Sequence, residues 1–319
     1  TAEDSDWVRY RERFISAEGR VVDTGNGRIS HSEGQGFGLV LARHYGDRST
    51  FARLWTWTRT HLQVREDRLL AWKWVPDSPD NPVPDRNNAT DGDLLVAWAL
   101  CRAGREWQVE DYLIAGRAMA ANIRTRLLRD SPRGLLLLPA EQGFVKDQIL
   151  TLNLSYWVFP AFGELDRCDP SPQWGALRDT GLALLAVARF GRWHLPPNWL
   201  TVGETLTPAN DFKPLYGYDA LRVPLYLSWA GLANAERLKP FLDYWAWFDG
   251  ARFLPAWTRL DDDSIDSYPA APGILAIVAL ARRVAGQPSP ALPPLNEGQD
   301  YYSASLLLLT RLAAAEGGG

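Results

Sequence analysis

The chain contains few cysteines and few histidines. Its 319 residues include only two cysteines, Cys101 and Cys168, and four histidines. Two thiols make neither a disulfide framework nor a zinc site, and they do not indicate the redox compartment. Cys101 falls inside an apolar helical pattern, which predicts a small buried filler. The histidines are scattered without the spacing of metal ligands, so we expect surface or capping roles and no metal centre.

Long apolar runs and basic clusters are also missing. The longest apolar runs, Leu94–Cys101 and Ile274–Ala281, are much shorter than the ~20 residues that a membrane-spanning helix needs. The formal net charge is −4 and no basic block is present, which argues against nucleic acid or an anionic membrane as the main partner. The first residues are the polar Thr-Ala-Glu-Asp, so we expect that any secretory signal has been removed.

Aromatic residues, in contrast, are abundant. The chain has 15 Trp, 11 Tyr and 11 Phe, and Trp72 and Trp74 fall in a segment with the character of a loop. Sugar rings stack on tryptophan faces in a cleft, because the C–H face of a pyranose is apolar and its rim is polar. The composition alone favours a carbohydrate ligand by a small margin.

Helical periodicity dominates the sequence and predicts an all-α fold. Strand-like alternation is confined to Leu69–Val75 and Leu135–Pro139. Short turns alternate with long loops at 64–89, 129–150, 191–217 and 250–271, which suggests a closed ring of helical hairpins with a cleft built by the long loops at one end. No linker divides the chain, so we expect one domain over residues 1–316 and a disordered tail at 317–319. The predicted helices are Trp7–Ile15, Glu33–His44, Thr50–Leu62, Asp91–Ala103, Gln108–Leu128, Leu152–Glu164, Trp174–Phe190, Tyr218–Ala230, Leu238–Phe248, Pro272–Ala285 and Gln299–Ala315.

Three motifs point to other chemistries. Gly34-Gln-Gly36-Phe-Gly38 lacks the spacing and the preceding strand of a nucleotide-binding loop. The His31-Ser-Glu33 segment resembles the start of a zinc deaminase signature, but the Pro-Cys-x-x-Cys partner is missing. Asp262-Asp-Ser-Ile-Asp266 fits a pattern that holds Mg²⁺ and a diphosphate in all-α isoprenoid enzymes. Nearby prolines make this last segment a loop, and we interpret it as a solvated acidic turn.

Three groups of acids lie at predicted helix starts. Glu33 follows Ser32 and is interleaved with glycines that would let a ligand approach closely. Asp91 and Asp93 follow two asparagines and a threonine, and Asp219 precedes Arg222 by three positions. A carboxylate in a first helical turn is usually a partner of the helix dipole, and Asp219 could simply pair with Arg222. The residues alone therefore leave each acid open between a capping and a catalytic role.

Several segments stand out when taken together in chain order. They are Gly19-Arg-Val-Val-Asp23, Ser32-Glu-Gly-Gln-Gly-Phe-Gly38, Leu70-Ala-Trp-Lys-Trp74, Asn88-Ala-Thr-Asp-Gly-Asp-Leu94 and Tyr218-Asp-Ala-Leu-Arg-Val-Pro224. With these segments the chain resembles glycoside hydrolase family 8, and within it the endoglucanases that accompany bacterial cellulose synthesis. The resemblance runs in order from about residue 7 to residue 302. One further segment, Leu152-Asn-Leu-Ser-Tyr156, matches except that Leu154 replaces a proline usual in many members.

The resemblance implies an (α/α)6 barrel with an open cleft at one end, a few short strands in its loops, and hydrolysis of β-1,4-glucan with inversion. It implies Glu33 as the general acid, Asp219 as the general base and Asp91 as the acid that grips the sugar. An inverting pair lies ~6.5–9.5 Å apart. We expect bound sugar, a tryptophan-lined wall and nearby acids to raise the pKa of Glu33 against the pull of the helix dipole. The resemblance, together with the polar and aromatic character of the same segments, also makes substrate-binding candidates of Trp72, Tyr156, Arg222, Asp93, Gln35 and Trp74.

The same resemblance implies no cofactor and no metal. It implies a secreted or periplasmic protein, which we expect to be a monomer with a functional link to cellulose synthase. Xylanase, chitosanase and lichenase specificities occur in the family and stay open. A non-catalytic glycan-binding protein would explain the tryptophan content but not the three acids.

Overall fold

The computed structural model describes residues 2–317, and the side chains from residue 4 onward. Helices predominate, which confirms the all-α prediction at this level. The helices are α1 (Ala2–Phe14), α2 (Ser32–His44), α3 (Arg48–His61), α4 (Thr90–Trp107), α5 (Glu110–Arg126), α6 (Phe162–Cys168), α7 (Pro172–Val187), α8 (Arg222–Trp229), α9 (Ala235–Trp247), α10 (Pro272–Val284) and α11 (Tyr301–Glu316), with two 3-10 helices, η1 (Leu154–Tyr156) and η2 (Phe159–Ala161). Residues 318 and 319 of the predicted tail lie outside the described part, and Gly317 closes the last turn of α11.

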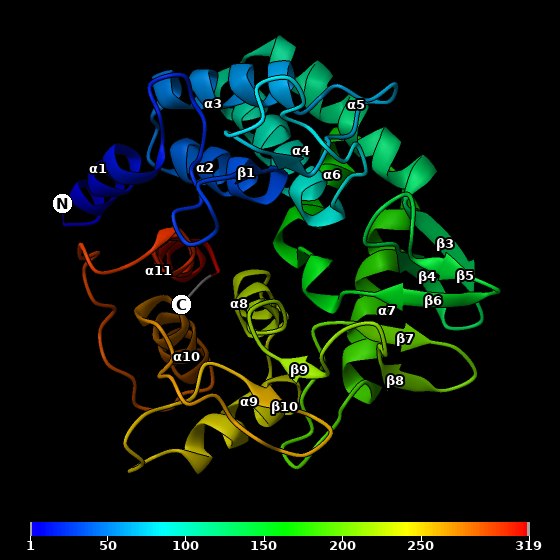
Figure 1. Ribbon diagram of the computed structural model, residues 1–319, viewed down its shortest axis with the longest axis vertical. Coiled ribbons are helices and arrows are strands. Elements are labelled where there is room, and N and C mark those ends of the chain that lie inside the picture. Colours follow the sequence, from blue (N-terminus) through cyan, green and yellow to red (C-terminus); the bar gives the residue numbers. More distant parts are fainter. Residues whose placement is uncertain (1, 318–319) are drawn as a thin grey trace.

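An inner set of helices is arranged side by side around the centre of the molecule (Figure 1). Helix α2 packs on α4 and α11, α8 packs on α10 and α11, and α4 packs on α6. These helices also start at the same end of the molecule. Side chains from the first turns of α2, α4 and α8 meet at Arg222, whereas Glu316 at the end of α11 contacts Arg43, Arg102 and Trp229 at the opposite ends of α2, α4 and α8.

Helices α1, α3, α5, α7 and α9 lie outside this inner set (Figure 1). Helices α10 and α11 are connected by residues 285–300, which have no regular structure. Arginines of α1 hold this segment: Arg9 donates to the carbonyl of Leu295, and Arg13 donates to those of Asn296 and Gln299. These hydrogen bonds attach the segment to the N-terminal helix.

The predicted helix Leu152–Glu164 is wrong. Its place is taken by the end of a strand, by η1 and η2, and by the start of α6. Pro160 explains the break, because a proline inside a helix removes one backbone hydrogen bond and clashes with the preceding turn. Between β6 and α7 the chain consequently forms only the short helices η1, η2 and α6.

Short strands build the loops at the end where the inner helices begin. They are β1 (Ser30–His31), β2 (Lys73–Trp74), β3 (Leu128–Ser131), β4 (Gly134–Leu137), β5 (Val145–Lys146), β6 (Ile149–Leu152), β7 (Leu200–Val202), β8 (Leu206–Pro208), β9 (Leu215–Tyr216) and β10 (Thr258–Arg259). The strand expected near 135–139 is confirmed as β4, but Leu69–Val75 supplies only β2. The antiparallel sheet β5-β6-β7-β8 was not predicted.

Cys101 and Cys168 form a disulfide between α4 and the end of α6, with their Cα atoms 6.0 Å apart. The prediction that Cys101 is only a buried filler is therefore wrong. The partners are separated by 67 positions, so no local pattern in the sequence connects them. The bond fixes the shortest inner helix to its neighbour.

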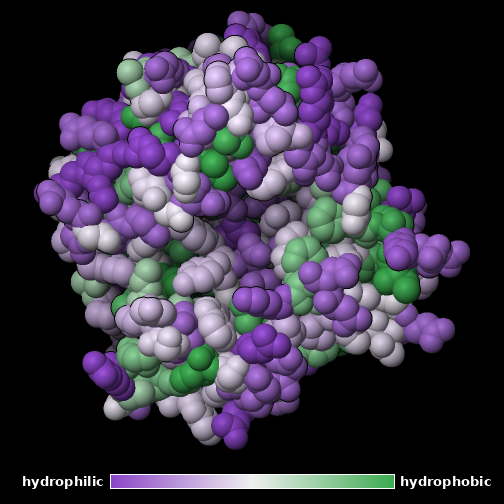
Figure 2. All heavy atoms as spheres, viewed as in Figure 1, coloured by the Kyte–Doolittle hydropathy of each residue, from purple (hydrophilic) through white to green (hydrophobic). Residues whose placement is uncertain are grey.

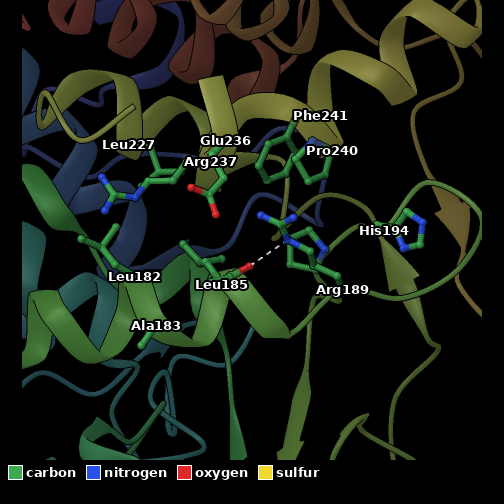
Figure 3. A pocket seen from close by; sticks show the side chains of 12 residues that line it. Leu182, Ala183, Leu185, Arg189, His194, Leu227, Glu236, Arg237, Pro240 and Phe241 are labelled. Atoms are coloured by element: carbon green, nitrogen blue, oxygen red, sulfur yellow. Dashed lines mark hydrogen bonds between the residues drawn. The ribbon is translucent and has the colours of Figure 1, made fainter. Parts of the chain in front are cut away.

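Several hollows mark the surface of the described residues. Figure 2 shows a depression lined by hydrophilic residues near the centre of the face on which the inner helices begin. A separate pocket of about 260 Å³ lies between α7 and α9 (Figure 3). Apolar side chains such as Leu182, Leu185 and Phe241 line this second pocket, together with the charged Arg189 and Glu236. None of the predicted catalytic acids lines it.

Candidate active site

Glu33 stands in the first turn of α2. The residue that caps this helix is His31, whose Nδ1 accepts from the backbone N–H of Gly34 at 3.0 Å. His31 Nε2 contacts Asp23 Oδ2 at 3.1 Å, which fixes the ring. The backbone N–H of Ser32 donates to the carbonyl of Trp72, so the loop that carries Trp72 is attached next to Glu33.

Asp91 stands in the first turn of α4, beside Glu33. The two helix starts can approach because residue 92 is a glycine: a Cβ there would lie 2.1 Å from Ser32 Oγ. Deeper along the same contact, a Cβ at Gly36 would lie 2.5 Å from the Cβ of Leu95. The glycines near Glu33 therefore serve the packing of α2 on its neighbours, and the prediction that they make room for a ligand is wrong.

Asp219 lies in a turn that precedes α8, and not in the helix that was predicted to begin at Tyr218. Pro224 stands in the first turn of α8, where a proline is best tolerated, and this favours the late start. Two side chains hold this turn. Asn198 Oδ1 accepts from the backbone N–H groups of Gly217 at 3.0 Å and Ala220 at 2.9 Å. The hydroxyl of Tyr302 donates to the carbonyl of Tyr218.

Arg222 joins the three acids. Its Nη1 donates to Glu33 Oε2 and lies 3.5 Å from Asp91 Oδ2, and its Nη2 lies 3.5 Å from Asp219 Oδ1. Nη2 also donates to Ser155 Oγ at 2.8 Å, and Ser155 Oγ donates to Asn153 Oδ1 at 2.5 Å. The Arg222 side chain is only 1% exposed, so it lies beneath the acids as a fixed positive charge.

The acids differ in their contact with solvent. The side chain of Asp91 is 3% exposed, that of Glu33 is 23% exposed and that of Asp219 is 33% exposed. Burial and the nearby Glu33 raise the pKa of Asp91 well above its ordinary value. Burial acts in the same direction on Glu33, but Arg222 and His31 outweigh it, and the pKa of Glu33 is lowered. The raised pKa of Glu33 expected for the sugar-bound site is not present in the protein without sugar, and for the bound state it stays a prediction.

Asp219 has a pKa raised by burial, and Arg222 opposes this shift. Tyr156 in η1 faces the same group of charges. Burial, followed by the charges of Asp91 and Asp219, raises the pKa of Tyr156 well above its ordinary value, so its hydroxyl stays protonated and can donate a hydrogen bond. The structure thus brings Glu33, Asp91, Asp219, Arg222 and Tyr156 together.

Trp72 and Trp74 differ in their surroundings. Both rings are half-buried, and Trp72 Nε1 donates to Asp85 Oδ2 at 3.1 Å. The ring of Trp74 packs edge-on against that of Trp57, and the guanidinium of Arg20 lies 4.7 Å from its centre. These contacts hold Trp74 against the protein, so Trp72 is the better candidate for a sugar contact.

Gln35 and Asp93 do not reach the other acids. Both are fully buried. Gln35 accepts from the backbone of Val21 and donates to Thr58, while Asp93 accepts from the backbone of Leu70 at 2.8 Å and from the Asn88 amide at 2.9 Å. Each lies two positions beyond an acid, and residues two apart on a helix face different directions. The expectation that they bind sugar conflicts with this burial, and we leave them out of the proposed site.

The acidic segment 262–266 is a loop, as predicted. Asp263 has a positive φ of 60° and its Oδ1 accepts from the backbone N–H of Arg192, while Asp262 and Asp266 accept from backbone groups two residues onward. Asp262 and Asp266 therefore order their own loop, and Asp263 attaches it to the loop that contains Arg192. Within residues 2–317, no group of three or more His, Cys, Asp or Glu side chains is arranged to hold a metal ion.

Sequence reasoning gave no role to Asn153, Ser155, Asn198 or Tyr302. Asn153 and Ser155 belong to the segment Leu152–Tyr156, and the match of this segment to the family pattern was the one signal in the sequence that could have found them. Asn198 and Tyr302 act from 21 positions before Asp219 and 83 positions after it, at distances along the chain where no local pattern operates.

Three carboxyls around the buried Arg222 are an arrangement suited to acid–base chemistry. Comparison with known proteins identifies the class of enzyme. Residues 1–316 match the sequence profile of Glycosyl hydrolases family 8. The chain belongs to this family and is a glycoside hydrolase.

Among curated relatives, the chain is similar to a probable endoglucanase of Novacetimonas hansenii, with 40% identity over 314 residues, which cover 97% of this chain and 90% of the relative. An endoglucanase of Cellulomonas uda is 37% identical over 275 residues, covering 85% of this chain and 75% of the relative. The solved structure of the endo-β-1,4-glucanase CMCax from Acetobacter xylinum has a TM-score of 0.92 and 39% identity, and the match covers 99% of this chain and 98% of that one.

Proposed function

We propose that this glycoside hydrolase is an endo-β-1,4-glucanase that acts with inversion. The observation that carries the proposal is the single buried guanidinium of Arg222, which holds three carboxyls of unlike exposure at the start of the inner helices. The substrate class is supported by the relatives, because both curated proteins described above are endoglucanases and the similar solved structure is an endo-β-1,4-glucanase.

The roles follow from position and exposure. Glu33 protonates the oxygen of the leaving sugar, and Asp219, the most exposed of the three acids, accepts a proton from the attacking water. Glu33 contacts one terminal nitrogen of Arg222 and Asp219 contacts the other, and we propose that the sugar and the attacking water lie between the two carboxyls. Tyr156 donates a hydrogen bond near the water, and Asp91 contacts both the sugar and Glu33. Trp72 provides a face for a neighbouring glucose ring.

We further propose that residues 1–316 form one catalytic domain, an (α/α)6 barrel with its cleft at the hollow seen in Figure 2. Five inner positions are filled by α2, α4, α8, α10 and α11, and the sixth by η1, η2 and α6. Their parallel arrangement supports this description. It also points the positive ends of the helix dipoles toward the acids, which favours negative charge there.

We propose a secreted or periplasmic location. The Cys101–Cys168 disulfide supports it, because disulfides persist mainly in oxidising compartments. No helix in residues 2–317 combines the length and the apolar character that a membrane span requires. A monomeric state and a functional link to cellulose synthase belong to the same proposal, and the endoglucanase relatives are consistent with the link.

The decisive experiment measures new reducing ends on carboxymethyl-cellulose, with xylan, chitosan and lichenan assayed in parallel. We expect carboxymethyl-cellulose to be cleaved at internal bonds, so that viscosity falls faster than reducing ends accumulate. Glu33→Gln should fold normally, bind glucan and lose at least ~10²–10⁴-fold in rate. Preferential cleavage of xylan or chitosan would move the enzyme to another specificity, and no cleavage of any glycan would contradict the proposal.

Stereochemistry provides a second test. An inverting enzyme that cleaves a β-linked oligosaccharide releases the α-anomer first. Proton NMR of the earliest products from cellopentaose should therefore show the α-anomer before mutarotation. A first product in the β-form would remove Asp219 from the role of base and require a covalent intermediate.

A further inference from the structure

Asp91 contains a buried oxygen that lacks a hydrogen-bond donor. Its Oδ1 accepts from the backbone N–H of Gly92 at 2.9 Å, whereas its Oδ2 is buried and receives no hydrogen bond from the described residues. The nearest cation, Arg222 Nη1, lies 3.5 Å away and donates to Glu33 instead. A buried carboxylate oxygen without a donor is strongly unfavourable, so a protonated Asp91 fits this environment better than an ionised one.

The charge balance of the site also favours a protonated Asp91. If Glu33, Asp91 and Asp219 were all ionised, three negative charges would surround the one positive charge of Arg222. One bound proton reduces this excess. Among the three acids, Asp91 is the least exposed and receives no charged hydrogen bond, while Glu33 receives one from Arg222. The proton is therefore most stable on Asp91 when no sugar is present.

We propose that Asp91 carries a proton in the sugar-free enzyme, donates it as a hydrogen bond from Oδ2 to Glu33, and passes it to Glu33 when glucan binds. This proposal rests on the glucanase function proposed above and gives Asp91 a role as the proton-holding, positioning residue of the acid. The two carboxyls then titrate as one pair that shares a proton.

The reaction balances with this one proton. On binding, the O–H bond of Asp91 breaks and an O–H bond forms on Glu33. During cleavage, Glu33 gives this proton to the leaving oxygen, which keeps the electron pair of the broken C–O bond. A water molecule forms the new C–O bond and gives its proton to Asp219. After the products leave, Asp219 loses a proton to solvent and the Glu33–Asp91 pair regains one.

The pKa shifts agree with this picture. Burial and Glu33 raise the pKa of Asp91, and Arg222 outweighs burial to lower that of Glu33. Other titratable and charged groups also face the pair. They are His31 and Tyr301 beside Glu33, Tyr156 from η1, Asp219 from the turn before α8, Tyr226 from α8 and Tyr302 from α11.

The first test observes the proton directly. Infrared difference spectra of enzyme labelled with ¹³C at the aspartate carboxyls, taken without substrate at pH 7, should contain a protonated-carboxyl band that disappears in Asp91→Asn. Asp93→Asn is the matched control: it removes a buried carboxyl from the same helical turn, and the Asp91 band should remain. Burial raises the pKa of Asp93 to about 7, so Asp93 adds its own band to both the wild type and Asp91→Asn, and this band cancels in their difference.

The second test uses activity. In Asp91→Asn the proton source is gone, so Glu33 must take its proton from solvent at its own lowered pKa. The basic limb of the pH profile of kcat/KM should therefore shift to lower pH by about one unit or more. At neutral pH this shift lowers kcat/KM at least ~10-fold. A β-cellobioside with a good leaving group needs little acid assistance and should lose much less. Equal losses on both substrates with an unmoved basic limb would assign Asp91 to sugar binding alone and overturn the proposal.

These outcomes separate the proposal from the function on which it rests. A wild-type enzyme that does not cleave glucan contradicts the function, whereas the infrared band needs no substrate. If Asp91→Asn does not fold, the labelled wild type is still decisive, with Asp93→Asn and Asp219→Asn used to assign the other bands. If the labelled wild type shows no protonated aspartate at pH 7 beyond those assigned to Asp93 and Asp219, the proposal is overturned.

Discussion

Glu316→Gln is expected to destabilise the protein at neutral pH. Glu316 ends α11 on the side opposite the acids, and its carboxylate accepts from Arg43 at 2.5 Å, from Arg102 at 3.0 Å and from Trp229 Nε1 at 3.0 Å. His44 approaches to 3.6 Å. The side chain is 17% exposed, so this carboxylate ties the last turns of four inner helices in a largely buried setting.

The magnitude follows from these contacts. Removing one partner of a buried ion pair costs ~3–5 kcal/mol. Glutamine keeps one acceptor oxygen, so we take the lower end, about 3 kcal/mol. With about 2.1 cal/mol/K per residue, the unfolding entropy of a chain of this length is about 0.7 kcal/mol/K, and Tm should fall by about 4 °C.

The pH dependence has a definite sign. Burial would raise the pKa of Glu316, but His44, Arg43 and Trp229 outweigh it and place the pKa well below its ordinary value. A carboxyl with a depressed pKa in the folded state stabilises fully above its unfolded pKa of about 4.3, and this contribution is lost as the pH falls. The Tm difference between wild type and Glu316→Gln should therefore be constant near neutrality and shrink below about pH 4.5.

Calorimetry between pH 3 and pH 7 measures both effects. Glu204→Gln is the control, since Glu204 is exposed and no hydrogen bond or ion pair of its side chain is present in the structure. A Tm change in Glu316→Gln no larger than that of the control would refute the reasoning. So would a difference that persists unchanged under acidic conditions.

Three further outcomes are expected. Asn198→Ala removes two hydrogen bonds from the turn that carries Asp219, and should lower kcat by ~10–100-fold with a smaller change in KM, measured by steady-state kinetics. Trp72→Ala should weaken oligosaccharide binding by ~1–2 kcal/mol in calorimetric titrations while Tm stays nearly constant; a large fall in Tm with unchanged affinity would show that the ring is structural. Reduction of the Cys101–Cys168 disulfide should destabilise the protein by ~4 kcal/mol for a loop of 67 residues, and reductant should have no such effect on Cys101→Ala.

Local patterns predicted much of the helical structure. The helices α2, α4, α10 and α11 begin within two residues of their expected starts, and the acids Glu33 and Asp91 stand in first turns as predicted. Helical periodicity depends on neighbours three or four positions apart, so it is visible in the sequence. The same periodicity could have warned that Gln35 and Asp93 turn away from Glu33 and Asp91.

Local patterns failed where a distant contact decides the structure. Pro224 favours the late start of α8, and Asn198 and Tyr302 hold Asp219 in a turn. The sheet β5-β6-β7-β8 depends on the pairing of residues 149–152 with residues 200–202, which no local alternation reveals. The disulfide likewise depends on the packing of α4 against α6.

The sequence by itself determined the family and the helical class and supplied the acids of the proposed site as candidates, because these depend on residue types and short spacings. Only the tertiary structure decided how the acids share charge. Arg222 follows Asp219 by three positions, which the sequence could explain as a local ion pair, yet its guanidinium also holds Glu33 from 189 positions away and approaches Asp91. A pKa depends on burial and on every charge within a few ångströms, whatever the distance along the chain. For that reason the sequence could assign Glu33 as the acid, but only the contacts of the folded chain lead to the proposal that Asp91 holds the proton before sugar binds.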